Sequence, residues 1–410
     1  MPDPTSRLLA LLPFVLVACV APESAPRDKT TTIPSTTSTP PTETTPTTPT
    51  TPTTPTTPTL PPLVDCDAIA VRPDGLTTFY ESNPTYPDAE DRLGPYAVVT
   101  PADAGLDEGL LNDANGDLEG RPFVNSFLVF KGGDLAWEEY FHGSGPQDSN
   151  NIHSSSKSIL GAAMGVAVAQ GLVELDEPAA TYLPTQFASQ NDPLKADITI
   201  RHLLTMTAGF RWVEDQTEYA LEDEPDWVQA IVDLPMRSDP GDWFNYSTGH
   251  THLLSAILQE VSGTSTCDFV HEEIFRPLDI AAEHWGRDPQ GVFSGGYNVY
   301  LTPRELARYG LMIADGGQWQ GEQVIAQSWV DDMLAEQERD APYGYGYLWW
   351  MRRLAGYDVQ IAWGYGGQFI YLVSDLDLMV VVTTNTHDYD PWYYDAENIL
   401  RDYVIPAAGG

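Results

Sequence analysis

Lysine is scarce in this 410-residue sequence. It occurs four times, as Lys29, Lys131, Lys157 and Lys195, and the remaining 16 basic side chains are arginine. Asp and Glu together number 59, so the formal net charge is −39. A surface of this sign repels phosphates instead of neutralising them, which excludes nucleic acid as an expected partner. The same charge disfavours docking on an anionic membrane surface.

Cysteine is scarcer still, with three in the chain. No CxxC motif is present, and no cysteine has the spacing of a zinc site. Cys66 and Cys267 stand about 200 residues apart, and the sequence leaves open whether they form a disulfide.

Several motifs of other enzyme classes are also missing. There is no GxSxG nucleophile elbow. The stretch "HEEIF" at His271 does not match the HExxH zinc pattern, and no glycine-rich phosphate loop opens a helix. His250 and His252 are two positions apart on a predicted helix, so they face different directions and make a poor metal pair. We therefore expect neither a metal nor a cofactor.

The N-terminus has the pattern of a targeting segment. Arg7 precedes the apolar run "LLALLPFVLVA", which is too short for a stable bilayer span and typical of a signal-peptide core. The run ends at Cys19 in a pattern that resembles a bacterial lipobox. We predict a signal peptide at 1–18 and a lipidated segment at 19–29 beginning at Cys19; ordinary secretion is the alternative. The protein is then exported, and lipidation would make it a membrane-anchored lipoprotein facing the periplasm or the cell surface.

Residues 30–62 are nearly all Thr and Pro. Such a segment buries no apolar surface and favours extended polyproline II, which would span roughly 100 Å at ~3.1 Å per residue. It is predicted to be a linker, either a tether or an inert spacer. The globular domain is predicted at 63–410.

The globular part shows strand patterns near both ends and helical patterns between them. Residues 124–141 predict a β-hairpin around a Gly-Gly turn. Helical spacing marks 155–173, 198–206, 226–234, 250–261 and 390–403, and strand patterns mark 347–352, 358–363, 368–373 and 378–384. Distant strands around a helical middle imply one sheet with an inserted helical subdomain.

Ser154 and Lys157, in "NIHSSSKSIL", share one face of the helix that is predicted to start there. The free N–H groups and positive dipole end at a helix start favour developing negative charge, and they disfavour a protonated lysine. A semi-buried neutral lysine can deprotonate a nearby serine, whereas arginine stays charged. The alternative is a helix-capping serine beside a surface lysine.

Two further stretches support a catalytic interpretation. The turn "PGDWFNYSTG" presents Tyr246, whose phenol can relay a proton to a leaving group; a core tyrosine is the alternative. The glycine-rich "AWGYGGQ" at 362–368 precedes a strand, where backbone N–H groups are accessible to an oxyanion; a plain turn is the alternative.

With these stretches the sequence resembles the serine hydrolases of the β-lactamase and penicillin-binding-protein superfamily, in the branch of 6-aminohexanoate-dimer hydrolase and related esterases. The resemblance runs from about Val99 to near Val404. It rests on "HSSSKS", "LLTMTAGFRW", "FNYSTGHTHLLSAILQEVSG", "IFRPLDI", "LTPRELARYG" and "AWGYGGQFIYLVSDLDLMVVV". It implies an α/β (α+β) fold of the β-lactamase/DD-peptidase type: an antiparallel sheet flanked by helices, with an inserted helical subdomain.

The resemblance also implies roles for individual residues. Ser154 would be the nucleophile, Lys157 its base and Tyr246 the tyrosine of the second motif. The backbone N–H groups of Ser154 and Tyr365 would form the oxyanion hole. The residues implied to contact substrate are Thr248, Trp363, Gly364 and Gly366.

Two departures from the family pattern affect the expected substrate. Thr248 stands where many relatives have Asn, and Ala362 stands where β-lactamases usually keep Lys or another polar group. Small esters or linear amides therefore fit better than β-lactams, and the expected function is an acyl-enzyme serine hydrolase. The alternatives are a penicillin-interactive D-Ala-D-Ala peptidase or β-lactamase, and a surface lipoprotein that binds without catalysis.

An acidic stretch, "EDQTEYALEDEPD", lies between the Ser154–Lys157 motif and the Tyr246 motif. Its seven carboxylates are Glu214, Asp215, Glu218, Glu222, Asp223, Glu224 and Asp226. One interpretation is a mobile lid whose negative field attracts substrates that carry an amino group. The other is an ordinary solvated acidic face.

Overall fold

The computed structural model describes residues 64–67, 69, 96–214, 216–282, 284–338, 343–385 and 393–410. The chain divides into units 1–57 and 58–410, and all of the described residues belong to the second. The predicted signal peptide, Cys19, the Thr/Pro linker and Asp215 lie outside the described residues. Within the described part, no helix combines the length and apolar character that a bilayer span requires.

A seven-stranded sheet forms the centre of the domain, in the order β2-β1-β11-β10-β9-β8-β7. Every neighbouring pair is antiparallel. The strands are β1 (Val124–Lys131), β2 (Asp134–Tyr140), β7 (Gly344–Tyr345), β8 (Trp350–Leu354), β9 (Tyr357–Gly364), β10 (Gln368–Val373) and β11 (Leu378–Thr384). The N-terminal hairpin thus joins C-terminal strands that are more than 200 residues away, as the sequence pattern predicts.

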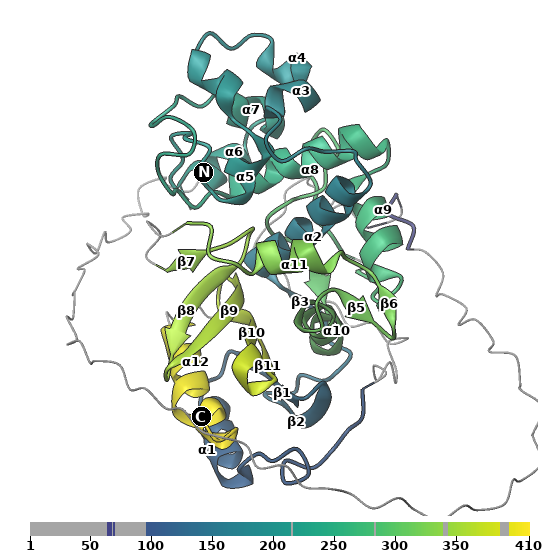
Figure 1. Ribbon diagram of the computed structural model, residues 1–410, viewed down its shortest axis with the longest axis vertical. Helices are drawn as coiled ribbons and strands as arrows, with labels where there is room; N and C mark the ends of the chain where they lie inside the picture. The colour runs from purple at the N-terminus through teal and green to yellow at the C-terminus, as the bar shows by residue number, and fades with distance from the viewer. Residues whose placement is uncertain are drawn as a thin grey trace, which may run out of the picture. The chain divides into compact units, whose positions relative to one another are not determined.

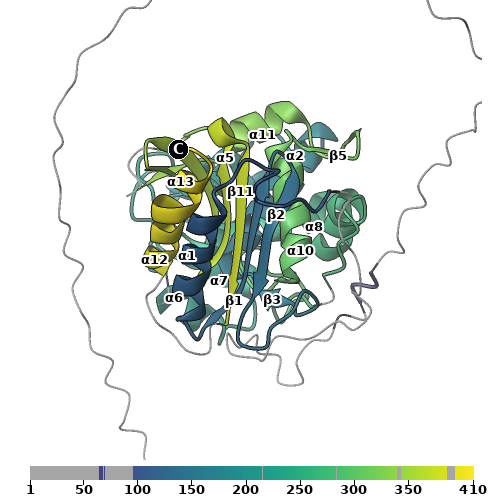
Figure 2. The ribbon, with the colours of Figure 1, turned by 90° about the horizontal axis from the view of Figure 1, so that it is seen from below.

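Helices cover both faces of this sheet (Figure 2). On one face lie α1 (Glu108–Glu119), α12 (Tyr393–Ile399) and α13 (Ile405–Ala407), and on the other lie α2 (Ser156–Ala169) and α10 (Pro303–Ala314). Side chains of β1 alternate between the two interfaces: Phe127 packs into one hydrophobic core and Leu128 into the other. Two-sided burial explains why β1 is apolar along most of its length.

A helical region is inserted between α2 and the later strands and lies apart from the sheet (Figure 1). It contains α3 (Ala179–Tyr182), α4 (Pro184–Phe187), α5 (Ile200–Leu204), α6 (Gln216–Leu221), α7 (Trp227–Asp233), α8 (Thr248–Ser262) and α9 (Thr266–Val270). Helix α11 (Gln327–Met333) and the short strand pairs β3 (Asn150–Asn151) with β4 (Tyr300–Leu301) and β5 (Gln318–Trp319) with β6 (Glu322–Gln323) complete the α-helices and strands of the described residues. The predicted fold class, an antiparallel sheet with flanking helices and a helical insertion, is confirmed.

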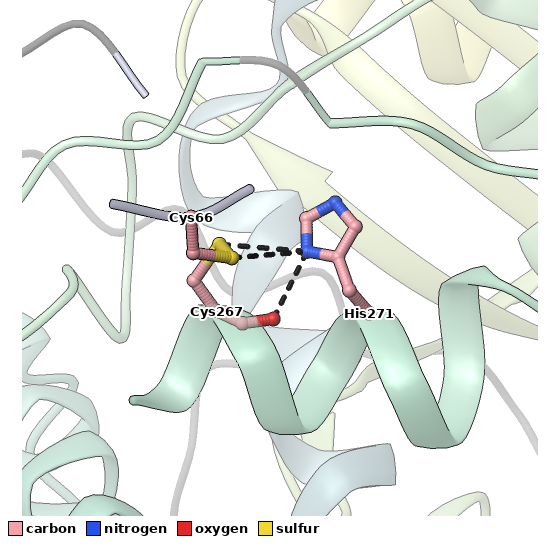
Figure 3. Close-up of side chains that lie close together, drawn as sticks. All are labelled: Cys66, Cys267 and His271. Atoms are coloured by element: carbon pink, nitrogen blue, oxygen red, sulfur yellow. Dashed lines mark hydrogen bonds between the residues drawn. A yellow bond between two sulfur atoms is a disulfide. The ribbon is translucent and has the colours of Figure 1, made fainter. Parts of the chain in front are cut away.

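Cys66 and Cys267 form a disulfide, which resolves the question that the sequence left open (Figure 3). Cys267 lies on α9, and the imidazole Nδ1 of His271 lies 3.4 Å from its sulfur and 3.7 Å from that of Cys66. Because the two sulfurs are bonded to each other, this trio offers one imidazole and no thiolate. The bond ties the start of the globular domain to a helix of the insertion.

Candidate active site

Ser154 lies in a 3-10 turn, His153–Ser155, that leads directly into α2. His153 has a φ of 45°, in the left-handed region that a residue with a side chain rarely adopts. Its backbone N–H donates to Oδ1 of Asn151 at 3.0 Å, which supports this conformation. Burial, with a smaller contribution from Lys157, lowers the pKa of His153 to about 3, so its imidazole is neutral. The sharp turn presents Ser154 at the start of the helix.

The turn is held against the edge of β9 and β10. The hydroxyl of Ser155 donates to the carbonyl oxygen of Gln368 at 2.8 Å. A Cβ added to Gly364 would lie 2.2 Å from the carbonyl oxygen of Ile152, so only glycine permits this approach. The motif at 362–368 and the motif at 153–158 are therefore in direct contact.

The amine of Lys157 is buried, with 1% of the residue exposed. Nζ lies 3.0 Å from Oγ of Ser154, 2.9 Å from Oγ1 of Thr248 and 2.9 Å from the carbonyl oxygen of Gly296. Burial lowers the pKa of Lys157, and the carboxylates of Glu214 and Glu218 oppose part of that fall. A buried amine with a lowered pKa and a hydroxyl within reach is the arrangement of a base beside a nucleophile.

Tyr246 lies just before α8, whose N-cap is Ser247. Its ring stacks on Trp350 with centroids 5.1 Å apart, and Nζ of Lys157 lies 5.0 Å from the ring centroid. Burial raises the pKa of Tyr246 well above its usual value, with additions from Tyr345 and Glu214, and a hydrogen bond to Ser154 opposes the rise. The phenol is therefore protonated at rest, which suits a proton donor or relay.

Ser154 lines a pocket of about 250 Å³. The two acidic side chains on its wall are Glu214 and Glu218, and no Lys or Arg of the described chain is among the lining residues. Most of the wall is aromatic: Tyr219, Tyr246, Tyr297, Tyr343, Trp350, Trp363 and Tyr365. The pocket thus offers apolar and negatively charged surface to a ligand.

The four residues predicted to contact substrate have different placements. Trp363 lines the pocket. Gly364 lies behind the wall against Ile152, and the carbonyl of Gly366 accepts a hydrogen bond from the Thr384 hydroxyl at 2.8 Å. Thr248 is buried under Lys157 and is not part of the wall.

Two residues of the site, Glu214 and Gly296, were not predicted from the sequence to be site residues. Glu214 appeared only as a member of the acidic stretch, yet its carboxylate accepts hydrogen bonds from the Thr248 backbone N–H at 3.0 Å and from the Thr248 hydroxyl. Gly296 receives the third hydrogen bond of Lys157, and a Cβ there would lie 3.0 Å from Nζ. The pair Gly295-Gly296 was the available signal for such a close approach. No local spacing pointed to Glu214.

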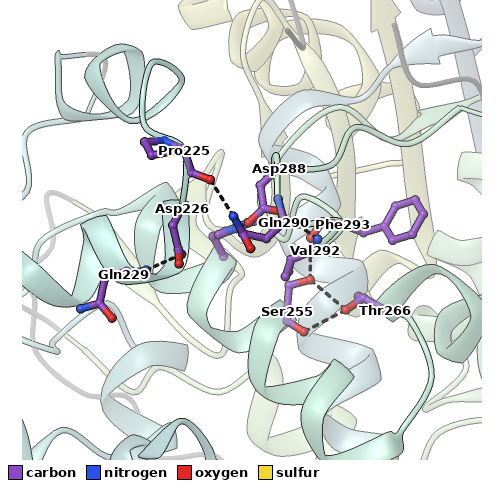
Figure 4. Close-up of polar contacts among 10 residues, drawn as sticks. Pro225, Asp226, Gln229, Ser255, Thr266, Asp288, Gln290, Val292 and Phe293 are labelled. Carbon is purple, nitrogen blue, oxygen red and sulfur yellow. Dashed lines mark hydrogen bonds and ion pairs between the residues drawn. The ribbon is translucent and has the colours of Figure 1, made fainter. Parts of the chain in front are cut away.

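The acidic stretch is hydrogen-bonded at its C-terminal end (Figure 4). Asp226 caps α7 by accepting from the backbone N–H of Gln229 at 2.9 Å. The carbonyl of Pro225 accepts from the side-chain amide of Gln290 at 2.8 Å. Asp288, whose carboxylate accepts from the backbone N–H of Gln290 at 2.8 Å, holds that loop in place. If the stretch moves as a lid, its C-terminal end either stays fixed by these hydrogen bonds or has to break them.

The chain is similar to known hydrolases along most of its length. The Beta-lactamase family matches residues 124–403. The 6-aminohexanoate-dimer hydrolase of Paenarthrobacter ureafaciens is 26% identical over 342 residues, covering 74% of this chain and 84% of that protein. The esterase/beta-lactamase LipL of Mycobacterium tuberculosis is 26% identical over 178 residues, and the match covers 42% of this chain and 38% of LipL.

A solved structure shares the fold. The octameric penicillin-binding protein homologue from Pyrococcus abyssi superposes with a TM-score of 0.56 at 18% identity, covering 73% of this chain and 76% of that one. The match to the family spans more than half of the sequence, and the sheet and its helical insertion agree with it. This chain belongs to the Beta-lactamase family, a family of hydrolases with the β-lactamase and penicillin-binding-protein fold.

Proposed function

We propose that the protein is a serine hydrolase that cleaves small esters or linear amides through an acyl-enzyme. Oγ of Ser154 attacks the substrate carbonyl carbon while its proton passes to Nζ of Lys157. Tyr246 relays that proton to the leaving alcohol or amine, and water then releases the acyl group from Ser154. The observation that carries the proposal is the 3.0 Å contact between a buried Lys157 amine and the Ser154 hydroxyl.

The oxyanion formed in this step needs hydrogen-bond donors close to Ser154. We assign them to the backbone N–H groups of Ser154 and Tyr365. The supporting observation is that Gly364, the residue before Tyr365, packs directly against Ile152 and so brings the strand edge to the turn that carries Ser154.

The pocket supports the choice of substrate class. Carboxylate-bearing substrates such as β-lactams and D-Ala-D-Ala peptides are repelled by negative charge, and the wall contains two carboxylates and no Lys or Arg among the described residues. Ala362, at the position where β-lactamases usually keep Lys, is buried in the hydrophobic core. Glu214 and Glu218 favour a substrate that carries an amino group, since an ammonium is attracted by carboxylates and by aromatic faces.

A fluorophosphonate probe and a substrate panel test the proposal. The wild type should be labelled and should cleave p-nitrophenyl acetate, p-nitrophenyl butyrate or a linear aminohexanoate dimer faster than nitrocefin or D-Ala-D-Ala. Ser154→Ala should abolish labelling and turnover, while Ser155→Ala should retain labelling. Preferred turnover of D-Ala-D-Ala or nitrocefin would favour the peptidase or β-lactamase alternative, and an unlabelled wild type would favour a binding protein.

We also propose that the protein is exported and held to a membrane by lipid at Cys19. The support is the apolar run that ends in the lipobox-like pattern, followed by a Thr/Pro segment that can act as a spacer.

A further inference from the structure

The hydroxyl of Thr248 joins Lys157 to the partly buried carboxylate of Glu214. Oγ1 of Thr248 lies 2.9 Å from Nζ of Lys157, and its hydroxyl hydrogen is donated to Oε1 of Glu214. The other carboxylate oxygen, Oε2, accepts from the Thr248 backbone N–H at 3.0 Å and from the indole N–H of Trp212. Thr248 and Trp212 are 2% and 1% exposed, so water has little access to compete for these bonds.

This arrangement determines which way the lone pair of a neutral Lys157 points. A threonine hydroxyl has one hydrogen, and here Glu214 accepts it, so Thr248 can only accept from Lys157. The carbonyl of Gly296 can also only accept. A neutral amine has two hydrogens and one lone pair; the hydrogens go to Thr248 and Gly296. The lone pair is left facing Oγ of Ser154 at 3.0 Å.

We propose that Glu214 is a positioning residue that holds the Thr248 hydroxyl as an acceptor and thereby aims the lone pair of Lys157 at Ser154. The inference rests on the proposed function. When Ser154 attacks, its O–H bond breaks, a bond forms between Oγ and the substrate carbonyl carbon, and the proton joins Nζ. The resulting ammonium has three hydrogens, of which two keep their places on Thr248 and Gly296 while the third is the one passed on to the leaving group.

Glu214→Gln tests this directly because the change preserves shape. Trp212 and the Thr248 backbone N–H are donors, so they retain the amide oxygen at the position of Oε2. The amide NH₂ then faces Oγ1 of Thr248 and donates to it. The Thr248 hydroxyl hydrogen turns toward Lys157 and occupies the lone pair that Ser154 needs. We expect kcat/KM for p-nitrophenyl acetate and the rate of fluorophosphonate labelling to fall roughly 100-fold, within the usual range for a positioned general base.

A double-mutant cycle separates this route from a direct effect on substrate or fold. In a Thr248→Val background the hydroxyl is gone, so adding Glu214→Gln should change the rate by less than about twofold. Equal losses from Glu214→Gln in both backgrounds would overturn the inference. Thr248→Ser, which keeps a hydroxyl at this position, should be at least about tenfold more active than Thr248→Val, which has none. This comparison remains informative if Glu214→Gln does not fold. A Thr248→Val variant as active as the wild type would also overturn the inference.

The pH profile supplies a readout that a purely structural role would not move. The Glu214 carboxylate raises the pKa of Lys157, so its removal should shift the acid limb of kcat/KM to lower pH while the plateau falls. Glu224→Gln removes the same charge from an exposed position, and it should change neither the acid limb nor the plateau of kcat/KM. A labelled wild type with an unchanged Glu214→Gln variant would overturn only this inference; a wild type that is never labelled would overturn the proposed function with it.

Discussion

Nζ of Lys157 lies 3.0 Å from Oγ of Ser154, and the two residues reach this contact across one turn at the start of α2. The same amine contacts Thr248 on α8 and Gly296 in the loop that precedes β4. Lys157 lies on α2, which packs on the sheet, and its amine is held by Thr248 of the helical insertion. The predicted catalytic pair therefore depends on both parts of the fold.

Lys157→Arg should be nearly as damaging as Lys157→Ala. A guanidinium stays charged and cannot accept the serine proton, so kcat/KM for p-nitrophenyl acetate should fall by about 10² or more in both variants. Thermal unfolding of each variant provides the control for folding. An arginine variant that retained more than roughly a tenth of the wild-type activity would exclude Lys157 as the base.

Gly364→Ala should lower both stability and activity. The added methyl would lie 2.2 Å from the Ile152 carbonyl oxygen, so β9 must move away from the turn that carries Ser154, at a cost of about 1–3 kcal/mol. The matched control is Gly116→Ala, in α1, where a new Cβ meets nothing within 4 Å. Chemical denaturation and ester turnover measure the two effects. A Gly364→Ala variant as stable and active as the wild type would contradict the tight contact.

The folded state should lose stability as pH rises toward neutrality because of Glu222. Burial, with a smaller contribution from Asp223, raises the pKa of Glu222 to about 7 from its usual 4.5. Below pH 4.5 the group is protonated in both states. Between 4.5 and 7 it ionises in the unfolded chain first, so the stabilisation present at low pH is lost as pH rises through the folded value.

Urea unfolding of the wild type and of Glu222→Gln across this pH range measures that contribution. The difference between the two should grow from pH 4.5 to 7 and then level off, and Glu224→Gln should not reproduce it. A constant difference across the range would contradict the raised pKa.

The Cys19 proposal predicts a change in detergent partitioning. Wild-type protein expressed with its complete N-terminus should enter the detergent phase, and Cys19→Ser should remain in the aqueous phase, because the acyl chains provide the membrane affinity. Mass spectrometry of the N-terminal peptide identifies the lipid. Equal partitioning of the two proteins would leave ordinary secretion as the explanation.

The acidic pocket predicts a preference for cationic substrates. With matched cationic, neutral and anionic esters, kcat/KM should favour the cation roughly threefold or more at low salt, and screening should reduce the preference. Glu218→Gln, which removes a charge from the pocket wall, should weaken it. The lid interpretation further requires that Glu222→Gln, Asp223→Asn and Glu224→Gln together weaken it.

Two results would separate these interpretations. A preference that survives the triple change but not Glu218→Gln assigns the effect to the pocket wall and leaves Glu222, Asp223 and Glu224 without a role in substrate choice. No charge preference in the wild type would remove both interpretations.

Much of the fold was predictable because its signals are local. Continuous runs of apolar, β-branched and aromatic residues marked β10 and β11 at the bounds that the structure has, and the Gly132-Gly133 turn marked the hairpin of β1 and β2. Boundaries of helices differed by a few residues, since their ends depend on capping and packing. The predicted helix at 155–173, for example, is a 3-10 turn followed by α2, which ends at Ala169.

The sequence by itself determined the Ser154–Lys157 pair, because a spacing of three on a helix brings two side chains together without help from the rest of the chain. It also determined the excess of negative charge and the candidate role of Tyr246. Tertiary structure alone decided that Glu214 reaches Thr248, that Gly296 receives the amine of Lys157, and that aromatic residues from distant segments enclose the pocket. Those contacts join residues that are tens to hundreds of positions apart, and only the packing of the insertion against the sheet specifies such distances.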